Sequence, residues 1–286
     1  MPSLDSYTHL PVRMSIYGDT GTGKTYALGK LAEKYKIHYL ALENGQQTLA
    51  DPKCVLPEFR KNVQVYTIVD TNEAPRAQIF MHNLLTTGKI TACEAHGSAN
   101  CAICATSTTK KEYTLALSSL GISDILVVDS MTQWDRSIRA MISKKHNVDW
   151  MAESAKDMHG ANNMMRFYDA LAHTWTGHLS RIQALQNTNI ICISHTRDTS
   201  KLDPSGKVVK KGRIVPAGGS ANTAESNASF FSDVIFSYKE NNAFKFASNP
   251  LQLAGVDAKS RTGFDCAGKD PRLALFELFQ KSVPTV

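Results

Sequence analysis

Gly18-Asp19-Thr20-Gly21-Thr22-Gly23-Lys24-Thr25 fits G-x-x-x-x-G-K-[ST], the pattern of a phosphate-binding P-loop. Residues 13–17 before it have the composition of a short strand, and residues 26–32 after it have the pattern of an amphipathic helix. This order lets backbone N–H groups and the helix N-terminus point at phosphate oxygens. In such a loop, Lys24 reaches the β- and γ-phosphates and the Thr25 hydroxyl binds Mg²⁺. The sequence therefore predicts that the whole motif binds ATP together with Mg²⁺.

The composition is that of a soluble globular protein. The chain has 286 residues, of which 42% are hydrophobic and 20% charged, enough for one large domain or two small ones. The sequence lacks a run of about 18 apolar residues, and its first residues do not resemble a signal peptide, so we expect a cytoplasmic protein with no membrane partner. The net charge of +6 permits nucleic acid as a partner but does not establish it. In that compartment, the six cysteines are expected to be thiols or metal ligands.

Apolar runs alternate with helical patterns along the chain, which indicates an α/β fold with a mainly parallel sheet. Residues 124–128 are rich in β-branched side chains and are expected in the centre of the sheet. We predict a single domain over residues 1–286, interrupted by segments at about 88–112 and about 196–222. The other expected elements are strands at 37–42, 63–68 and 189–194, an antiparallel pair at 234–238 and 243–247, helices at 74–85, 132–144 and 164–185, and a connector at 46–62.

Three polar residues follow predicted strands. Asp129 ends the apolar run 125–128, where a carboxylate at the carboxyl edge of the sheet can hold the hydration shell of Mg²⁺; with a P-loop upstream we favour this role over that of a helix cap. Glu43 follows the second strand and either activates the attacking water or is a solvated loop acid. His195 follows the fifth strand and either senses the γ-phosphate or makes a structural hydrogen bond.

A cluster of soft metal ligands lies in the first interrupting segment, with the spacing Cys93-x-x-His96-x-x-x-x-Cys101-x-x-Cys104. Two such pairs joined by a short turn can close a tetrahedral Zn²⁺ site. Four protein ligands leave no open coordination position, so the predicted role is structural, as a staple for an insertion with little core of its own. The alternative is that the four residues are unrelated and lie in a loop.

The second interrupting segment is strongly basic. A basic loop above the strand ends can grip the phosphate backbone of single-stranded DNA, and its position after His195 can couple it to the nucleotide. The alternative is a solvated hairpin, which is the usual meaning of a run of charges. Residues 147–166 are a candidate for a second DNA loop. Between residues 197 and 213, six cations stand against two carboxylates, a balance of +4; the cations are Arg197, Lys201, Lys207, Lys210, Lys211 and Arg213.

Together, these motifs resemble those of the RecA-type ATPase family. Residues 125–130 are similar to the Walker B strand of that family, including the serine after the aspartate. Glu43 falls where the family carries its catalytic glutamate, and His195 falls where a polar sensor ends a strand. Residues 218–222 resemble the segment after the family's second DNA-binding loop. Lys259-Ser260-Arg261 matches a K-x-R pattern.

Within the family, the chain looks most like the small phage ATPases of the Sak group, which are single-strand annealing proteins, over roughly residues 10–280. The resemblance implies a RecA-like P-loop NTPase core and ATP-dependent binding of single-stranded DNA in phage-type recombination, with DNA-stimulated hydrolysis at subunit interfaces. It also implies that Lys259 and Arg261 reach the phosphates of a neighbouring subunit. The implied partners are single-stranded DNA, further copies of the chain in a ring or filament, and a single-strand-binding protein in the cytoplasm of a bacterial host.

Two other functions fit the same motifs. A hexameric helicase or translocase of the RecA fold shares the nucleotide site and is distinguished by directional unwinding. An ATP-dependent switch whose basic loop and zinc site bind protein is distinguished by ATP hydrolysis that does not respond to DNA. The residues expected to act in hydrolysis are Lys24, Glu43, Asp129, His195, Lys259 and Arg261.

Overall fold

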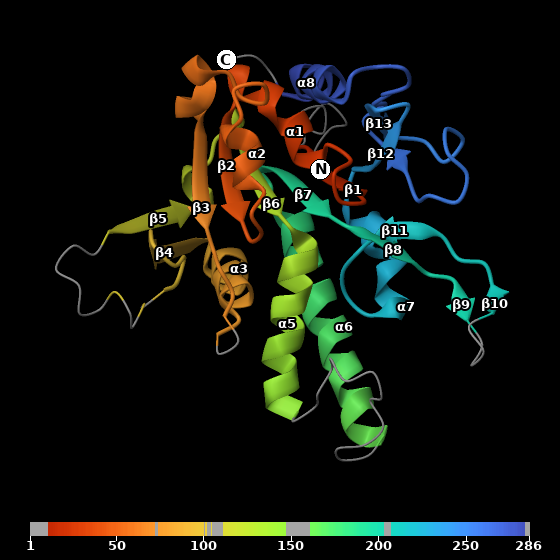
Figure 1. The fold of residues 1–286 in the computed structure, drawn as a ribbon. Coiled ribbons are helices and arrows are strands. Elements are labelled where there is room, and N and C mark those ends of the chain that lie inside the picture. The colour runs from red at the N-terminus through yellow and green to blue at the C-terminus, as the bar shows by residue number, and fades with distance from the viewer. Residues whose placement is uncertain are drawn as a thin grey trace, which may run out of the picture.

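The computed structural model of the protein describes residues 11–71, 74–99, 101, 104, 111–146, 161–202 and 207–283 (Figure 1). Its centre is an eight-stranded sheet in the order β13-β12-β1-β7-β6-β2-β3, with β14 paired to β12. The strands from β12 to β3 are mutually parallel, whereas β13 and β14 run antiparallel to β12. This arrangement confirms the mainly parallel sheet and the antiparallel C-terminal strands. The strands are β1 (Arg13–Gly18), β2 (Lys36–Ala41), β3 (Val63–Thr67), β6 (Asp124–Asp129), β7 (Asn189–Ser194), β12 (Asp233–Glu240), β13 (Ala243–Ala247) and β14 (Lys259–Ser260).

The inner strands β6 and β7 are apolar because both of their faces are covered. Every residue of β7 is buried, and in β6 only Asp124 is partly exposed. Ile, Leu and Val suit such a strand, since their side chains pack well on a pleated surface. The predicted central position of residues 124–128 is confirmed by the pairing of β6 with β2 on one side and β7 on the other.

Helices pack on both faces of the sheet, and each face has its own hydrophobic core (Figure 1). The core on one face contains Trp134, Phe167 and Trp175, and the core on the other contains Met14 and Leu275. Helices α5 and α6 extend well beyond the sheet as a pair. The elements of the first face are α3 (Arg76–Thr87), α5 (Met131–His146) and α6 (Ala161–Ala184); those of the second are α1 (Lys24–Leu28), the 3₁₀ helix η2 (Gly29–Glu33) and α8 (Pro271–Ser282).

The two predicted interruptions of the core both leave it as hairpins. The first is framed by the antiparallel pair β4 (Lys89–Cys93) and β5 (Glu112–Ala116). The second is framed by β8 (Thr196–Asp198) with β11 (Ile214–Pro216), and its outer part by β9 (Lys201–Leu202) with β10 (Val208–Lys210). Short elements complete the described chain: α2 (Gln46–Ala50), η3 (Pro57–Asn62), η4 (Leu117–Ser119), α7 (Ala221–Ala224) and η5 (Asn227–Phe230).

Some local expectations were wrong. The helix expected over residues 26–32 ends as an α-helix at Leu28 and continues as a 3₁₀ turn, where the chain packs so closely that a Cβ at Gly29 would lie 2.2 Å from the carbonyl oxygen of Cys54. The connector at residues 46–62 contains α2 and η3. Helix α8 was not expected. In the ranges given above, no helix combines the length and the apolar character needed to cross a bilayer.

Candidate functional site

The P-loop lies between β1 and α1, and the backbone there requires its glycines. Gly21 and Gly23 have φ values of 76° and 89°, in the left-handed region that favours glycine. Gly18 lies so close to β12 that a Cβ would be 2.1 Å from the carbonyl oxygen of Ser237. The Ser237 hydroxyl in turn donates to the carbonyl of Thr22 at 2.8 Å. The loop is therefore held from β12 as well as from its own strand.

The Lys24 side chain folds back onto the first residues of the P-loop. Its Nζ donates to the carbonyl oxygens of Gly18 and Asp19, both at 2.7 Å. Burial lowers the pKa of Lys24, and the carboxylates of Asp129, Asp19 and Glu43 act in the opposite direction. The ammonium group thus sits where phosphate oxygens can replace the two carbonyls as its acceptors.

The candidate Mg²⁺ ligands Thr25 and Asp129 are in contact. The Thr25 hydroxyl donates to Asp129 Oδ2 at 2.9 Å, and the Tyr39 hydroxyl donates to the same oxygen. Burial raises the pKa of Asp129, while these two hydroxyl groups oppose that shift. Gly45 permits the arrangement, since a Cβ there would lie 2.2 Å from the Tyr39 hydroxyl and 2.6 Å from Asp129 Oδ2. A hydroxyl and a carboxylate side by side are hard oxygen donors of the kind that Mg²⁺ prefers.

Glu43 and His195 come together at the carboxyl edge of the sheet, although 152 positions separate them in the numbering. His195 Nε2 lies 3.6 Å from Glu43 Oε2, and the Ser130 hydroxyl donates to Glu43 Oε1 at 2.5 Å. The His195 imidazole is the main cause that keeps the pKa of Glu43 below its usual value, with a further contribution from Ser130. The backbone N–H of His195 donates to the Thr132 hydroxyl at 2.9 Å, which fixes the end of β7 against α5. Glu43 is therefore an ionised carboxylate, as a group that accepts a proton from water must be.

These groups surround one cavity of about 310 Å³. Tyr26 and Phe244 supply an aromatic part of its wall, with ring centroids 5.7 Å apart. The sequence alone does not indicate this pair, nor Tyr39 and Ser130, because each has the pattern of a core or loop residue in its own segment. The residues that line the cavity are Thr20, Gly21, Thr22, Gly23, Lys24, Thr25, Tyr26, Glu43, Gly45, Thr48, Asp129, Ser130, Ile193, Ser194, His195 and Phe244.

Comparison with protein families gives one match that spans most of the chain: the AAA domain model matches residues 10–262. The chain belongs to the AAA domain family. Among solved structures, it is similar to the ATPase from the type III secretion system of pathogenic bacteria, with 12% identity and a TM-score of 0.39, over 93% of this chain and 63% of that one. The chain thus spans less than two thirds of that protein. No curated protein matches it.

The AAA domain assignment confirms the coarse part of the sequence prediction. An AAA-type P-loop ATPase domain accounts for the P-loop, the mainly parallel sheet and the position of Asp129 at a strand end. It implies a bound nucleotide with Mg²⁺. The finer likeness to the Sak group stays a prediction.

The basic hairpin of the AAA domain starts at the nucleotide site. Thr196, the first residue of β8, follows His195 directly, and its hydroxyl donates to Asp19 Oδ1 of the P-loop at 2.5 Å. At the opposite strand of the hairpin base, just after β11, the backbone N–H of Ala217 donates to the carbonyl of His195 at 2.9 Å. Both strands at the base of the hairpin are therefore tied to residues that line or border the cavity.

The expected DNA-binding cations have different surroundings. Lys207, Lys211 and Arg213 are exposed. Arg197 instead points inward: its guanidinium donates to the carbonyl of Gly219 at 2.9 Å, and burial lowers its pKa. The side chains of Lys201 and Lys210 lie outside the described part of the chain, as do residues 147–160 of the proposed second DNA loop.

Lys259 and Arg261 lie away from the AAA domain's own nucleotide cavity. Lys259 pairs with Val234 near the start of β12, whereas the P-loop begins beside Ser237. The pKa of Lys259 is lowered by burial and then by Arg261. Arg261 lines a separate cleft of about 450 Å³. Neither residue is among those that line the nucleotide cavity.

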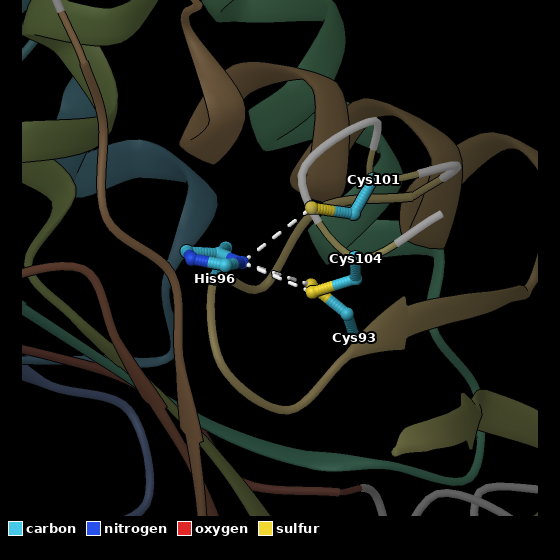
Figure 2. Close-up of side chains that lie close together, drawn as sticks. All are labelled: Cys93, His96, Cys101 and Cys104. Carbon is cyan, nitrogen blue, oxygen red and sulfur yellow. Dashed lines mark hydrogen bonds between the residues drawn. The ribbon is translucent and has the colours of Figure 1, made fainter. Parts of the chain in front are cut away.

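The four predicted zinc ligands are brought together by the structure. Cys93, His96, Cys101 and Cys104 each offer a ligand atom, and these atoms all lie within 4.8 Å of one another (Figure 2). The cluster is on the β4–β5 side of the AAA domain, away from the P-loop.

Proposed function

We propose that this AAA domain hydrolyses ATP and uses the nucleotide state to control its binding of single-stranded DNA, in annealing or strand exchange. The observation that carries the proposal is the hydrogen bond between Thr196 and Asp19. It joins the P-loop to the first residue of a basic hairpin. A change at the phosphates therefore reaches the hairpin through one residue.

The residues around the cavity support hydrolysis in defined roles. Lys24 can exchange its two carbonyl acceptors for the β- and γ-phosphate oxygens. Thr25 and Asp129 would hold Mg²⁺, which would supply positive charge to offset the negative charge of the phosphates. Glu43 is ionised and can accept a proton from the attacking water. A nucleobase can stack against the aromatic wall made by Tyr26 and Phe244.

His195 is the proposed link between the γ-phosphate and the hairpin. It lines the cavity, contacts Glu43 at 3.6 Å and precedes Thr196. A γ-phosphate beside His195 would compete with Glu43 for contact with the imidazole. The resulting movement of the His195 backbone would displace the adjacent Thr196. Hydrolysis would then reverse the change.

The charge of the hairpin supports DNA as the partner. Lys207, Lys211 and Arg213 present exposed cations, which suit the phosphates of a single strand without regard to its sequence. The resemblance to the RecA-type family supports the same position for DNA. Lys259 and Arg261, which do not line their own cavity, are proposed to act on the nucleotide of a neighbouring copy in a ring or filament.

A protein-binding switch is the second candidate, because the hairpin also exposes apolar side chains. Val208 and Val209 are 53% and 64% exposed. Such side chains could form part of an apolar surface that contacts a protein. In that case, ATP would control the capture of a protein.

The test is binding of a fluorescent single-stranded oligonucleotide to the full chain, measured by anisotropy at several salt concentrations with and without a non-hydrolysable ATP analogue. The variant K207Q/K211Q/R213Q should weaken binding and reduce the salt dependence, the slope of log K against log[salt], by about 2, since each phosphate contact to a single strand contributes about 0.7. The matched control K36Q/K53Q/K61Q removes three exposed cations elsewhere and should leave the slope unchanged. Equal effects of the two variants would contradict the proposal, and ATP-independent binding would favour the protein switch.

A further inference from the structure

Three sulfur atoms in the β4–β5 insertion converge on one imidazole nitrogen (Figure 2). His96 Nδ1 lies 3.7 Å from Cys93 Sγ, 3.5 Å from Cys101 Sγ and 3.3 Å from Cys104 Sγ. Cys93 and Cys101 are buried, and all three thiols are free of disulfides. The nucleotide site uses none of these groups.

Hydrogen bonding does not account for this convergence. A neutral imidazole nitrogen either donates one N–H or accepts through one lone pair, so Nδ1 can serve one of the three sulfurs at a time. A thiol is also a weak donor and a weak acceptor. Three sulfurs at nearly equal distances from one nitrogen therefore indicate a common partner between them.

The distances fit a tetrahedron around Zn²⁺. With Zn–S bonds of about 2.3 Å and a Zn–N bond of about 2.0–2.1 Å, a tetrahedral angle places each sulfur about 3.5–3.6 Å from the nitrogen. The three observed distances, 3.3, 3.5 and 3.7 Å, bracket that value.

We propose that Cys93, His96, Cys101 and Cys104 bind one Zn²⁺ ion in a closed, structural site. Thiolates and imidazole are the ligands of structural zinc, and a Cys₃His set is one of its standard forms. With four protein ligands, the ion has no position for water or substrate. The four ligands are distinct from the residues proposed to bind DNA and from the candidate Mg²⁺ ligands.

The ion would fix the insertion against the carboxyl end of β3. Gly97 follows His96 with a φ of 61°, and a Cβ there would lie 2.3 Å from the carbonyl oxygen of Thr67. Its N–H donates to the carbonyl of Cys93 at 2.9 Å, which closes the turn around the ligands. On the next strand, the ring of Tyr113 lies 4.8 Å from that of Tyr66 of β3. The metal-binding turn is packed on the sheet rather than held away from it.

From the end of β3, hydrogen bonds continue to the start of α5. Asp70 accepts from the Ser137 hydroxyl at 3.1 Å and from the Gln133 side chain at 3.2 Å. The backbone N–H of Gln133 donates to the hydroxyl of Ser130, which is the residue that donates to Glu43. A zinc ion that orders the turn beside Thr67 would therefore also support the helix that positions Ser130.

The experiment measures metal content and ligand chemistry, not ATPase activity. Purified full-length protein should contain about one zinc per chain by elemental analysis. C101S should reduce zinc to near zero, while C266S, which removes a buried thiol outside the cluster, should retain it. Protein produced with Co²⁺ in place of Zn²⁺ should show the visible bands of tetrahedral cobalt bound to thiolates.

Folded wild-type protein that holds no zinc and gives no such cobalt bands would overturn the proposal. Stoichiometric iron with the absorption of an iron–sulfur cluster would overturn it equally. If C101S does not fold, the cobalt spectrum of the wild-type chain decides the question alone. Loss of DNA binding with zinc retained would reject the proposed function and leave the metal site standing.

Discussion

Replacing Tyr39 with Phe should weaken the fold at the nucleotide site, although Tyr39 lies inside a strand that looks purely structural. Its hydroxyl donates to Asp129 Oδ2, and the Asp129 side chain is almost fully buried, with 5% of the residue exposed. A hydrogen bond to a buried charged group contributes about 1.5–3 kcal/mol. The free energy of unfolding of Y39F should therefore fall by about 2 kcal/mol, and its Tm by roughly 3 °C for a chain of this size.

The matched control is Tyr35 to Phe. Tyr35 is also buried and lies in the core on the α1 side of the sheet, but within the described residues its hydroxyl has no hydrogen-bond partner. Burying an unpaired hydroxyl costs about 1–3 kcal/mol, so Y35F should be as stable as the wild type or more stable. Urea unfolding of the three proteins without nucleotide or Mg²⁺ measures the difference.

The same variant has a functional signature. Because the Tyr39 hydroxyl lowers the pKa of Asp129, its loss lets burial raise that pKa further, and Asp129 then takes up a proton at a higher pH. As the pH is lowered, the apparent Mg²⁺ affinity in ATP hydrolysis should therefore begin to fall at a higher pH in Y39F than in the wild type. Equal stability of Y39F and Y35F would refute the reasoning, as would a Mg²⁺ requirement in Y39F with wild-type pH dependence.

Three further predictions follow from other contacts. His178 is 2% exposed, and burial lowers its pKa to about 4, so the unfolded chain takes up a proton at a higher pH than the folded chain does. Lowering the pH from 7 to 5 should reduce the free energy of unfolding by about 2 kcal/mol through this residue. In urea titrations, the free energy of unfolding of H178Q should depend less on pH over this range. T196V removes the hydroxyl that donates to Asp19, whereas T196S keeps it. Loss of a hydrogen bond worth about 1 kcal/mol should lower the ratio of ATPase rates with and without DNA about fivefold, and only in the valine variant. A wild-type ratio in T196V would count against coupling of the P-loop to the hairpin through Thr196. E43Q should bind ATP normally, measured by calorimetry, but hydrolyse it at least 100-fold more slowly; near-normal turnover would remove Glu43 from its proposed role.

The nucleotide site could be predicted from sequence where its residues are contiguous or follow a simple strand. The P-loop and Asp129 were found because phosphate binding needs a local glycine pattern and because an apolar run ends at the sheet edge. The proposed zinc ligands could be recognised for the same reason, since all four lie within twelve residues. Glu43 and His195 could be placed at one edge because parallel strands end there together.

The remaining parts of the site depend on long-range register. Tyr39 meets Asp129 because β2 pairs with β6 so that Ala41 lies beside Asp129, and nothing in either segment specifies that pairing. The bond from Thr196 to Asp19 spans 177 positions. Helix α8 is a different case, because its start could have been predicted from the sequence: Asp270 caps it and Pro271 occupies its first turn.

The most direct test of the central claim is the rate of ATP hydrolysis by the purified chain, with and without single-stranded DNA, beside the variant K24A. We predict hydrolysis that DNA stimulates several-fold and that K24A abolishes, because Lys24, whose ammonium group lies within the P-loop, is the proposed cation for the β- and γ-phosphates. Hydrolysis that is the same with and without DNA would contradict control of a DNA-binding hairpin by the nucleotide, and activity retained in K24A would contradict the assignment of the site itself.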